Sequence, residues 1–265
     1  MRVVIKVGTS LIAPAGVIDA NLLRGIVDQF DLARNEYLIV TSGAIAAGMS
    51  GLGLANRASD VHRNVPRMQA CAAVGQSQLM HTYERLFFGK KVVAQLLLSS
   101  DDFTAPVRYR NLQNAVAELL ALGVVPIVNE NDSVSVRELE GAFGDNDELS
   151  SLLAKAVKAD WLLLLTNVDG FMVPGRRGKP QLQRTILKLT PALEAQCNGK
   201  SSLGRGGMIS KLRAAKLASE AGVHVAIVNG RLPQAIHLGT QRKIGTYFPP
   251  STDRSLVQKR KKSQS

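Results

Sequence analysis

A series of short, almost uninterrupted apolar runs constrains the fold of this chain more than any other feature of its sequence. These runs are rich in Val, Ile and Leu and span residues 3–7, 37–40, 92–98, 124–128, 161–165 and 223–228. Strands that helices cover on both faces have this near-continuous hydrophobicity, whereas strands with one solvated face alternate between apolar and polar residues. The runs therefore predict a buried, mainly parallel sheet.

Segments with helical periodicity lie between these runs. Their apolar residues fall on one helix face, as in Leu112, Val116, Leu119 and Leu120, and again in Leu212, Ala215 and Ala218. Strands that alternate with helices imply βαβ units, so we predict an α/β fold with helices on both faces of the sheet. In such a fold, ligands bind beyond the carboxyl ends of the strands.

Length and cysteine usage favour one domain in a reducing compartment. A chain of 265 residues can bury a full core without disulfides or metals, and Cys71 and Cys197 stand far apart without metal-binding spacing. No apolar run approaches the length of a membrane span, and the N-terminal run reads as a first strand rather than a signal peptide. We expect a cytoplasmic protein, with a catalytic domain over residues 1–250 and a basic, disordered tail over residues 251–265.

The charge balance favours an anionic ligand. The chain has 33 Lys and Arg against 21 Asp and Glu, a net charge of +12. That excess suits a nucleotide, a nucleic acid or an acidic membrane, and does not choose among them. No basic stripe is interleaved with aromatic residues, as single-strand binding requires, so we expect no nucleic-acid partner. We also expect no membrane partner, because no apolar run is long enough to span a bilayer.

Two basic features predict a phosphate site. Lys6 lies inside the first apolar run, where a buried ammonium group is costly unless an anion meets it; the alternative is an edge-strand lysine that reaches solvent. Residues 204–208, Gly-Arg-Gly-Gly-Met, precede a helical segment with Lys211 in its first turn, which suits phosphate binding, although a glycine cluster can also be a flexible loop. Neither the P-loop nor the dinucleotide-binding glycine pattern is present.

Residues 144–150, Gly-Asp-Asn-Asp-Glu-Leu-Ser, form an acidic segment that we expect to be a turn before a helix. Helix capping accounts for one or two of its polar residues. The others could orient lysines, bind Mg²⁺ through water or recognise a substrate ammonium group. The four histidines form no pattern with cysteines or acidic residues, so hydrolase chemistry is disfavoured, while phosphoryl transfer needs little from histidine.

Taken in order, six blocks of sequence resemble the amino acid kinase family. They are VIKVGTS (4–10), VTSGAIAAG (40–48), VNENDSV (128–134), GDNDELS (144–150), LLLLTNVDG (162–170) and GRGGMISK (204–211). The second, third and fourth blocks resemble the members that phosphorylate the side-chain carboxylate of glutamate. The resemblance extends to about residue 248 and implies a three-layer αβα sandwich with a mostly parallel, eight-stranded sheet.

The resemblance also implies residue roles. Lys6 and Lys211 would hold ATP phosphates and stabilise the transition state, Asp147 would orient both lysines, and Asp145 would help to place substrate and Mg²⁺, which ATP carries. Glutamate would be bound by Ser42, Gly43, Asn129, Asp132 and Asn146. ATP would lie against Lys6, Gly8, Thr166, Asn167, Arg205, Gly206, Gly207, Met208, Ile209, Ser210 and Lys211.

Two positions depart from the family pattern, because Asn167 stands where an acidic residue is common and Arg205 where threonine is usual. Both lie on the nucleotide side. Many of the glutamate-phosphorylating members continue into a small C-terminal PUA domain, and we expect this chain to be the single-domain form. The resemblance further implies the first step of proline synthesis, inhibition by proline, hand-off of the product to glutamate-5-semialdehyde dehydrogenase, and a homo-oligomer.

Two alternatives stay open. Another kinase of the same family, such as an acetylglutamate kinase, an aspartokinase or a uridylate kinase, shares the block at 162–170, whereas the blocks at 40–48 and 128–134 favour glutamate. A non-catalytic sensor of amino acids or nucleotides could retain the fold. The joint presence of Lys6, Asp132, Asp147 and Lys211 argues against it.

Overall fold

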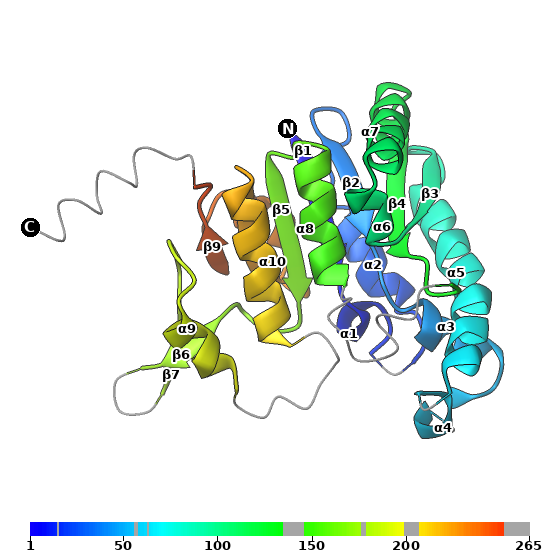
Figure 1. Cartoon of the computed structure of the whole chain (residues 1–265), viewed down its shortest axis with the longest axis horizontal. Helices are drawn as coiled ribbons and strands as arrows, with labels where there is room; N and C mark the ends of the chain where they lie inside the picture. Colours follow the sequence, from blue (N-terminus) through cyan, green and yellow to red (C-terminus); the bar gives the residue numbers. More distant parts are fainter. Residues whose placement is uncertain are drawn as a thin grey trace, which may run out of the picture.

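The computed structural model describes residues 1–14, 16–55, 58–62, 64–134, 146–175, 179–198 and 207–251. In that part of the chain the central sheet has seven strands in the order β3-β4-β2-β1-β5-β8-β9 (Figure 1). All neighbours pair in parallel except β8 and β9. The predicted α/β fold with a mostly parallel sheet is confirmed, with seven strands among the described residues where eight were expected.

The strands of this sheet are β1 (Arg2–Val7), β2 (Glu36–Val40), β3 (Val93–Leu98), β4 (Val125–Glu130), β5 (Trp161–Thr166), β8 (His224–Asn229) and β9 (Thr246–Phe248). A separate antiparallel hairpin consists of β6 (Met172–Pro174) and β7 (Pro180–Leu182). The expected apolar runs all form strands of the sheet, because each is short, apolar on both faces and followed by polar or small residues.

Helices cover both faces of the sheet. One apolar core contains side chains of α7 (Pro106–Ala121), α8 (Asn146–Ala156) and α10 (Met208–Glu220). The core on the opposite face contains side chains of α1 (Thr9–Ile12), α2 (Ala20–Val27), α3 (Ala44–Gly51), α5 (Val65–Phe87) and α11 (Ala235–Thr240). The shorter elements are α4 (Ala58–His62), α6 (Asp101–Thr104), α9 (Pro191–Ala195) and a 3₁₀ turn at Gln196–Asn198.

The alternation of side chains along β1 decides where Lys6 points. Val3, Ile5 and Val7 belong to the core that contains α2 and α5, whereas Val4 belongs to the core under α7, α8 and α10. Side chains two residues apart in a strand share a face, so Lys6 points to the same side as Val4. Figure 1 shows α8 and α10 side by side over this part of the sheet, which brings both helices to Lys6.

Two glycines let the backbones of α3 and α5 lie in direct contact. A Cβ atom at Gly75 of α5 would lie 1.8 Å from the Ala44 carbonyl oxygen, and one at Gly48 of α3 would lie 1.8 Å from the Cys71 carbonyl oxygen. Neither position can hold a side chain without moving a backbone. The two glycines therefore fix the distance of α5 from α3, and with it the position of the residues next to Gly75.

Substitution of Gly75 by alanine is expected to destabilise the protein by about 3 kcal/mol, the upper part of the range for overpacking, because the obstacle is backbone. Gly25→Ala is the matched control. Gly25 lies inside α2, is exposed and has no atom within 4 Å of an added Cβ, so the change should be neutral or stabilising by up to about 1 kcal/mol. Urea unfolding measures both; equal stabilities of the two variants would contradict the packing described.

Candidate active site

Polar and small residues gather at the carboxyl edge of the parallel sheet. Each follows or ends a strand, because strands that run in parallel all finish at the same edge. The residues are Gly8 after β1, Ser42 after β2, Asn129 as the second-last residue of β4, Thr166 at the end of β5 and Asn229 at the end of β8. The expected substrate residues thus lie on the β2–β4 side and the expected nucleotide residues on the β5–β8 side, with β1 between them.

Three charged side chains meet at the centre of this edge. The Lys6 ammonium group lies 2.7 Å from Oδ1 of Asp147, and the Lys211 ammonium group lies 3.0 Å from Oδ2 of the same carboxylate. Lys6 comes from β1, Asp147 from the first turn of α8 and Lys211 from the first turn of α10. The structure therefore brings together the three residues that the sequence analysis grouped.

All three groups are buried, which makes their charges costly without further compensation. Burial by itself raises the pKa of Asp147, but the charges of Lys6 and Lys211 and the hydrogen bonds from Lys6 and Ser210 outweigh it and hold that pKa well below its usual range. Asp147 is thus ionised at neutral pH. Two ammonium groups and one carboxylate leave one positive charge in excess among these three groups, which favours an incoming anion.

The surroundings of the lysines suit a phosphate group. A Cβ atom at Gly8 would lie 3.4 Å from Nζ of Lys6, so a side chain at this position would be in contact with that ammonium group, and glycine leaves more room beside it. Gly207 caps the amino end of α10, and the Ser210 hydroxyl donates to Asp147 Oδ2 at 2.7 Å. Free amides and the positive end of the dipole at a helix start attract anions.

Of the remaining predicted residues in the glycine loop and the acidic turn, two are among the described residues and three are not. Met208 and Ile209 open α10 and are half-buried. Asp145, Arg205 and Gly206 lie outside the described residues, so the expectations for them stay predictions.

On the β2–β4 side, the predicted substrate residues Ser42, Gly43 and Asp132 lie just beyond the ends of β2 and β4. The Ser42 hydroxyl donates to the Val7 carbonyl at 2.9 Å, which ties the ends of β2 and β1 together. Gly43 has φ +87°, a left-handed conformation that favours glycine, and it begins α3. Asp132 is buried two residues beyond the end of β4.

A buried chain of three amides completes this side, and sequence reasoning missed one member. Asn129 Nδ2 donates to Gln76 Oε1 at 2.9 Å, and Asn146 Nδ2 donates to Asn129 Oδ1 at 3.1 Å. Asn129 and Asn146 were predicted; Gln76, from α5, was not. The available signal was a polar residue at helical spacing between the buried residues Ala72 and Leu79.

The nucleotide side is built from the ends of β5 and β8. Thr166 is buried, and its carbonyl oxygen accepts from the Gly230 amide at 2.8 Å. Asn167 is exposed at this edge. Asn229, which the sequence did not single out, donates from Nδ2 to Asp169 Oδ1 at 2.9 Å and so links the two strand ends.

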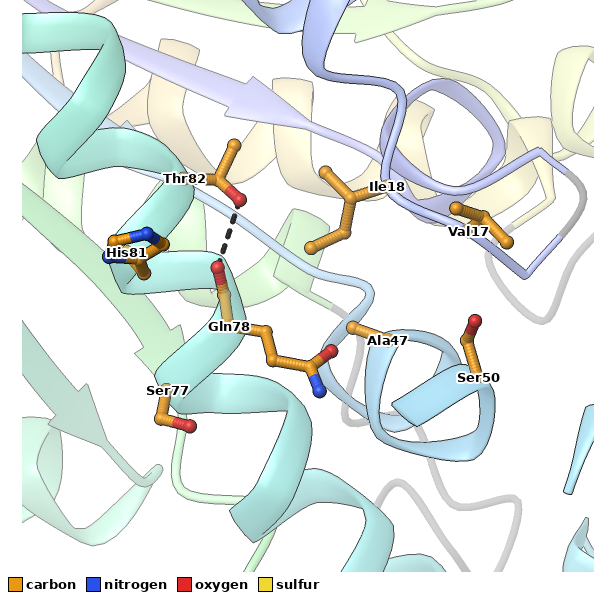
Figure 2. Close-up of a pocket in the computed structure, with 8 residues that line it drawn as sticks. All are labelled: Val17, Ile18, Ala47, Ser50, Ser77, Gln78, His81 and Thr82. Carbon is orange, nitrogen blue, oxygen red and sulfur yellow. Dashed lines mark hydrogen bonds between the residues drawn. The ribbon is translucent and has the colours of Figure 1, made fainter. Parts of the chain in front are cut away.

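A separate hollow of about 420 Å³ lies between α3, α5 and the segment before α2 (Figure 2). Its lining residues are Val17, Ile18, Ala47, Ser50, Ser77, Gln78, His81 and Thr82. None of the predicted site residues is among them. Figure 2 shows the Gln78 side chain directed toward Ala47 and α3.

The described side chains at this edge of the sheet offer few direct ligands for a metal ion. Within the described ranges, no three His, Cys, Asp or Glu side chains gather as a metal site. The Asp147 carboxylate is already engaged by Lys6, Lys211 and Ser210, so it is a poor direct ligand. Mg²⁺ is usually held by phosphate oxygens and water, with one or two carboxylates.

In the described part of the chain, the helices are too short or too polar to cross a membrane.

An α/β sheet whose carboxyl edge carries two buried lysines, a shared carboxylate and a helix start defines a phosphotransferase, in which positioning and charge carry the chemistry. The chain belongs to the amino acid kinase family, whose sequence model matches residues 1–229.

Two relatives that the chain resembles in sequence are glutamate 5-kinases. The chain is 41% identical to the glutamate 5-kinase of Myxococcus xanthus (strain DK1622), over 96% of this chain and 68% of that protein. It is 40% identical to the glutamate 5-kinase of Clostridium acetobutylicum, over 94% of each.

Solved structures agree with the fold. The carbamate kinase of Giardia superposes with a TM-score of 0.62 at 18% identity, over 94% of this chain and 98% of that one. An isopentenyl phosphate kinase superposes with a TM-score of 0.60 at 17% identity, over 94% of this chain and 100% of that one.

Proposed function

We propose that this chain transfers the γ-phosphate of ATP to the side-chain carboxylate of L-glutamate, the first step of proline biosynthesis. The observation that carries the proposal is the buried Lys6–Asp147–Lys211 cluster, which lies at β1, between the polar residues at the ends of β2 and β4 and those at the ends of β5 and β8. The identity of about 40% to proteins named glutamate 5-kinase supports glutamate as the acceptor.

The chemistry follows from the charges. An oxygen of the substrate carboxylate attacks the γ-phosphorus, a P–O bond forms, and the bond to the ADP oxygen breaks, giving L-glutamyl 5-phosphate. Lys6 and Lys211 would neutralise the phosphate charge that opposes this attack, and Asp147 would hold both lysines in place. Mg²⁺, carried by the ATP phosphates and reached by Asp145 through water, would supply further charge neutralisation.

Recognition of the two substrates would be divided between the two sides of β1. Asp132 would bind the glutamate ammonium group, with Ser42, Gly43, Asn129 and Asn146 around the rest of the molecule. The nucleotide would lie along Gly8, Thr166, Asn167 and the segment from Arg205 to Lys211.

Asp132→Ala is expected to raise the KM for glutamate by about 100-fold while kcat falls much less, because a charge-assisted contact to the ammonium group is worth about 1.5–3 kcal/mol or more in a buried site. The KM for ATP should stay within about threefold. Steady-state kinetics with each substrate varied in turn measures this. A loss confined to kcat would show that Asp132 acts in the chemical step instead.

The acceptor itself is tested by ADP release from Mg-ATP with glutamate, N-acetylglutamate, aspartate or UMP. The proposal predicts that kcat/KM with glutamate exceeds that with N-acetylglutamate or UMP by at least about 100-fold, since a site built to pair with a substrate's charged groups rejects analogues without them. Aspartate keeps those groups and lacks only one methylene, so the expected preference over aspartate is about 10- to 100-fold. Preference for N-acetylglutamate, aspartate or UMP would move the chain to another branch of the family.

The proposal also covers the domain bounds, the cellular compartment, the inhibition and the use of the product. Residues 1–250 would form the catalytic domain, in the cytoplasm, where cysteines without disulfide spacing are expected. Proline would lower glutamate turnover, and glutamate-5-semialdehyde dehydrogenase would consume the labile product. Proline added to the assay, and co-purification with that dehydrogenase, test the last two; unchanged rates and absence of a complex would contradict them.

A homo-oligomer is proposed as well, supported by the strand at one edge of the sheet. Among the described residues β3 is an edge strand, and Val92, Leu97 and the strongly exposed Phe88 lie on or before it. Unpaired strand edges with apolar side chains are natural pairing surfaces. Light scattering at micromolar concentration tests this, and a monomer at every concentration would contradict it.

A further inference from the structure

We infer that Gln76 is a positioning residue that orients the amides of Asn129 and Asn146, so that the site selects a carboxylate substrate that carries an ammonium group. The inference rests on the proposed function and adds a residue from α5, on the far side of the sheet edge from the lysines. It concerns which acceptor is bound rather than how the phosphate is transferred.

The hydrogen bonds of the three side chains run in one direction. Gln76 contributes only an acceptor, Oε1, to its bond with Asn129. Asn129 is thereby fixed with its Nδ2 toward Gln76 and its Oδ1 toward Asn146. Asn146 must then use Nδ2 for its own bond, which leaves Oδ1 as the group that makes no bond within this chain of amides.

Because the three amides are buried, the direction of their hydrogen bonds has an energetic consequence. Gln76, Asn129 and Asn146 are 8%, 0% and 2% exposed. Asn146 Oδ1 and Gln76 Nε2 are buried, and no hydrogen-bond partner for either lies among the described residues. An unmade hydrogen bond in such a place costs about 1–3 kcal/mol, so each end of the amide chain favours a ligand of matching chemistry.

The acceptor end of the chain matches a cation. Asn146 directly precedes Asp147, whose carboxylate holds both lysines, so the Oδ1 acceptor lies beside the phosphate site on the chain. An ammonium group can donate to such an oxygen, whereas a carboxylate or a methylene group cannot. If the amides were reversed, Nδ2 of Asn146 would take the place of Oδ1 and repel the ammonium group.

The fold holds Gln76 in place. Gly75, its neighbour, lies against the Ala44 carbonyl oxygen, so this part of α5 cannot shift toward α3. The side chain therefore meets the end of β4 at one fixed distance. A shorter or apolar side chain at position 76 would leave the Asn129 amide without the acceptor that sets its direction.

The test compares Gln76→Met, which keeps the volume and loses the acceptor, with Gln76→Glu, whose carboxylate can still accept from Asn129. The probe is the preference for glutamate over glutarate, which lacks only the ammonium group, measured as the ratio of the Ki of glutarate to the KM of glutamate. We expect at least a tenfold fall of this ratio in Gln76→Met and a change within about threefold in Gln76→Glu.

Gln78→Met is the matched control, because Gln78 lies on the same helix, lines the separate hollow of Figure 2 and should leave the ratio unchanged. Thermal unfolding checks that each variant is folded. A Gln76→Met variant that keeps the wild-type ratio overturns the inference, whether or not its kcat at saturating glutamate falls. Wild-type protein that does not phosphorylate glutamate overturns the proposed function first, and this inference with it.

Discussion

Asp147→Asn is expected to lower the free energy of unfolding of the ligand-free protein by about 3–5 kcal/mol, because removal of one partner leaves buried charges uncompensated. Lys6 and Lys211 both lie on this carboxylate and are both buried. Turnover should fall by at least about 1,000-fold, since neither lysine keeps its position. Mg-ATP should restore part of the lost stability, because its phosphates compensate the same ammonium groups.

Urea unfolding with and without Mg-ATP measures these effects. Glu36→Gln is the matched control: it makes the same chemical change in the exposed ion pair with Arg2, and it should cost less than about 1 kcal/mol. Similar losses in the two variants would show that the buried cluster contributes no more than a surface pair.

The pH dependence has a defined sign. The folded pKa of Asp147 is depressed, so its contribution to stability is present in full above the unfolded pKa of about 3.9 and is lost as the pH falls through the folded value. The stability gap between wild type and Asp147→Asn should therefore be constant at neutral pH and narrow below about pH 4.

Lys211→Ala is expected to lower kcat by about 1,000-fold with little loss of stability. The remaining Lys6–Asp147 pair is balanced in charge, so no buried charge is left alone within the cluster. The lost ammonium group is one of two that face the transferring phosphate in the proposed reaction, and removal of one such charge costs about 2.7–4 kcal/mol in the transition state.

Lys216→Ala is the control for this prediction, since Lys216 lies on the exposed side of the same helix and its loss makes the same change in net charge. It should retain wild-type kinetics. A Lys211→Ala variant that keeps more than a tenth of the wild-type kcat, at saturating substrates, would contradict a role for Lys211 in the chemical step.

Much of the fold could be predicted because its signals are local. Buried parallel strands such as β1 and β5 are continuous apolar runs, and α10 shows its apolar face at helical spacing. The strand β9 and the hairpin of β6 and β7 escaped prediction because three residues give no periodicity. Their positions depend on tertiary pairing, as in the contact of β9 with β8.

The site was predictable where a residue is anomalous in its local sequence. Lys6 in an apolar strand and the acidic residues in the first turn of α8 stand out, and the structure brings Lys6 to Asp147. Gln76 gave only the weaker signal of a polar residue on the apolar face of a long helix, and Asn229, at the end of an ordinary strand, gave none. Their partners, Asn129 and Asp169, are 53 and 60 residues away in sequence, and only the fold joins them.

Formation of an acyl phosphate tests the central claim most directly. Purified protein would be incubated with Mg-ATP, glutamate and hydroxylamine, and ADP and glutamyl hydroxamate would be measured together. The account predicts that both appear at equal rates and that neither appears without glutamate. ADP release without hydroxamate, or no turnover from folded protein, would contradict phosphoryl transfer to the glutamate carboxylate.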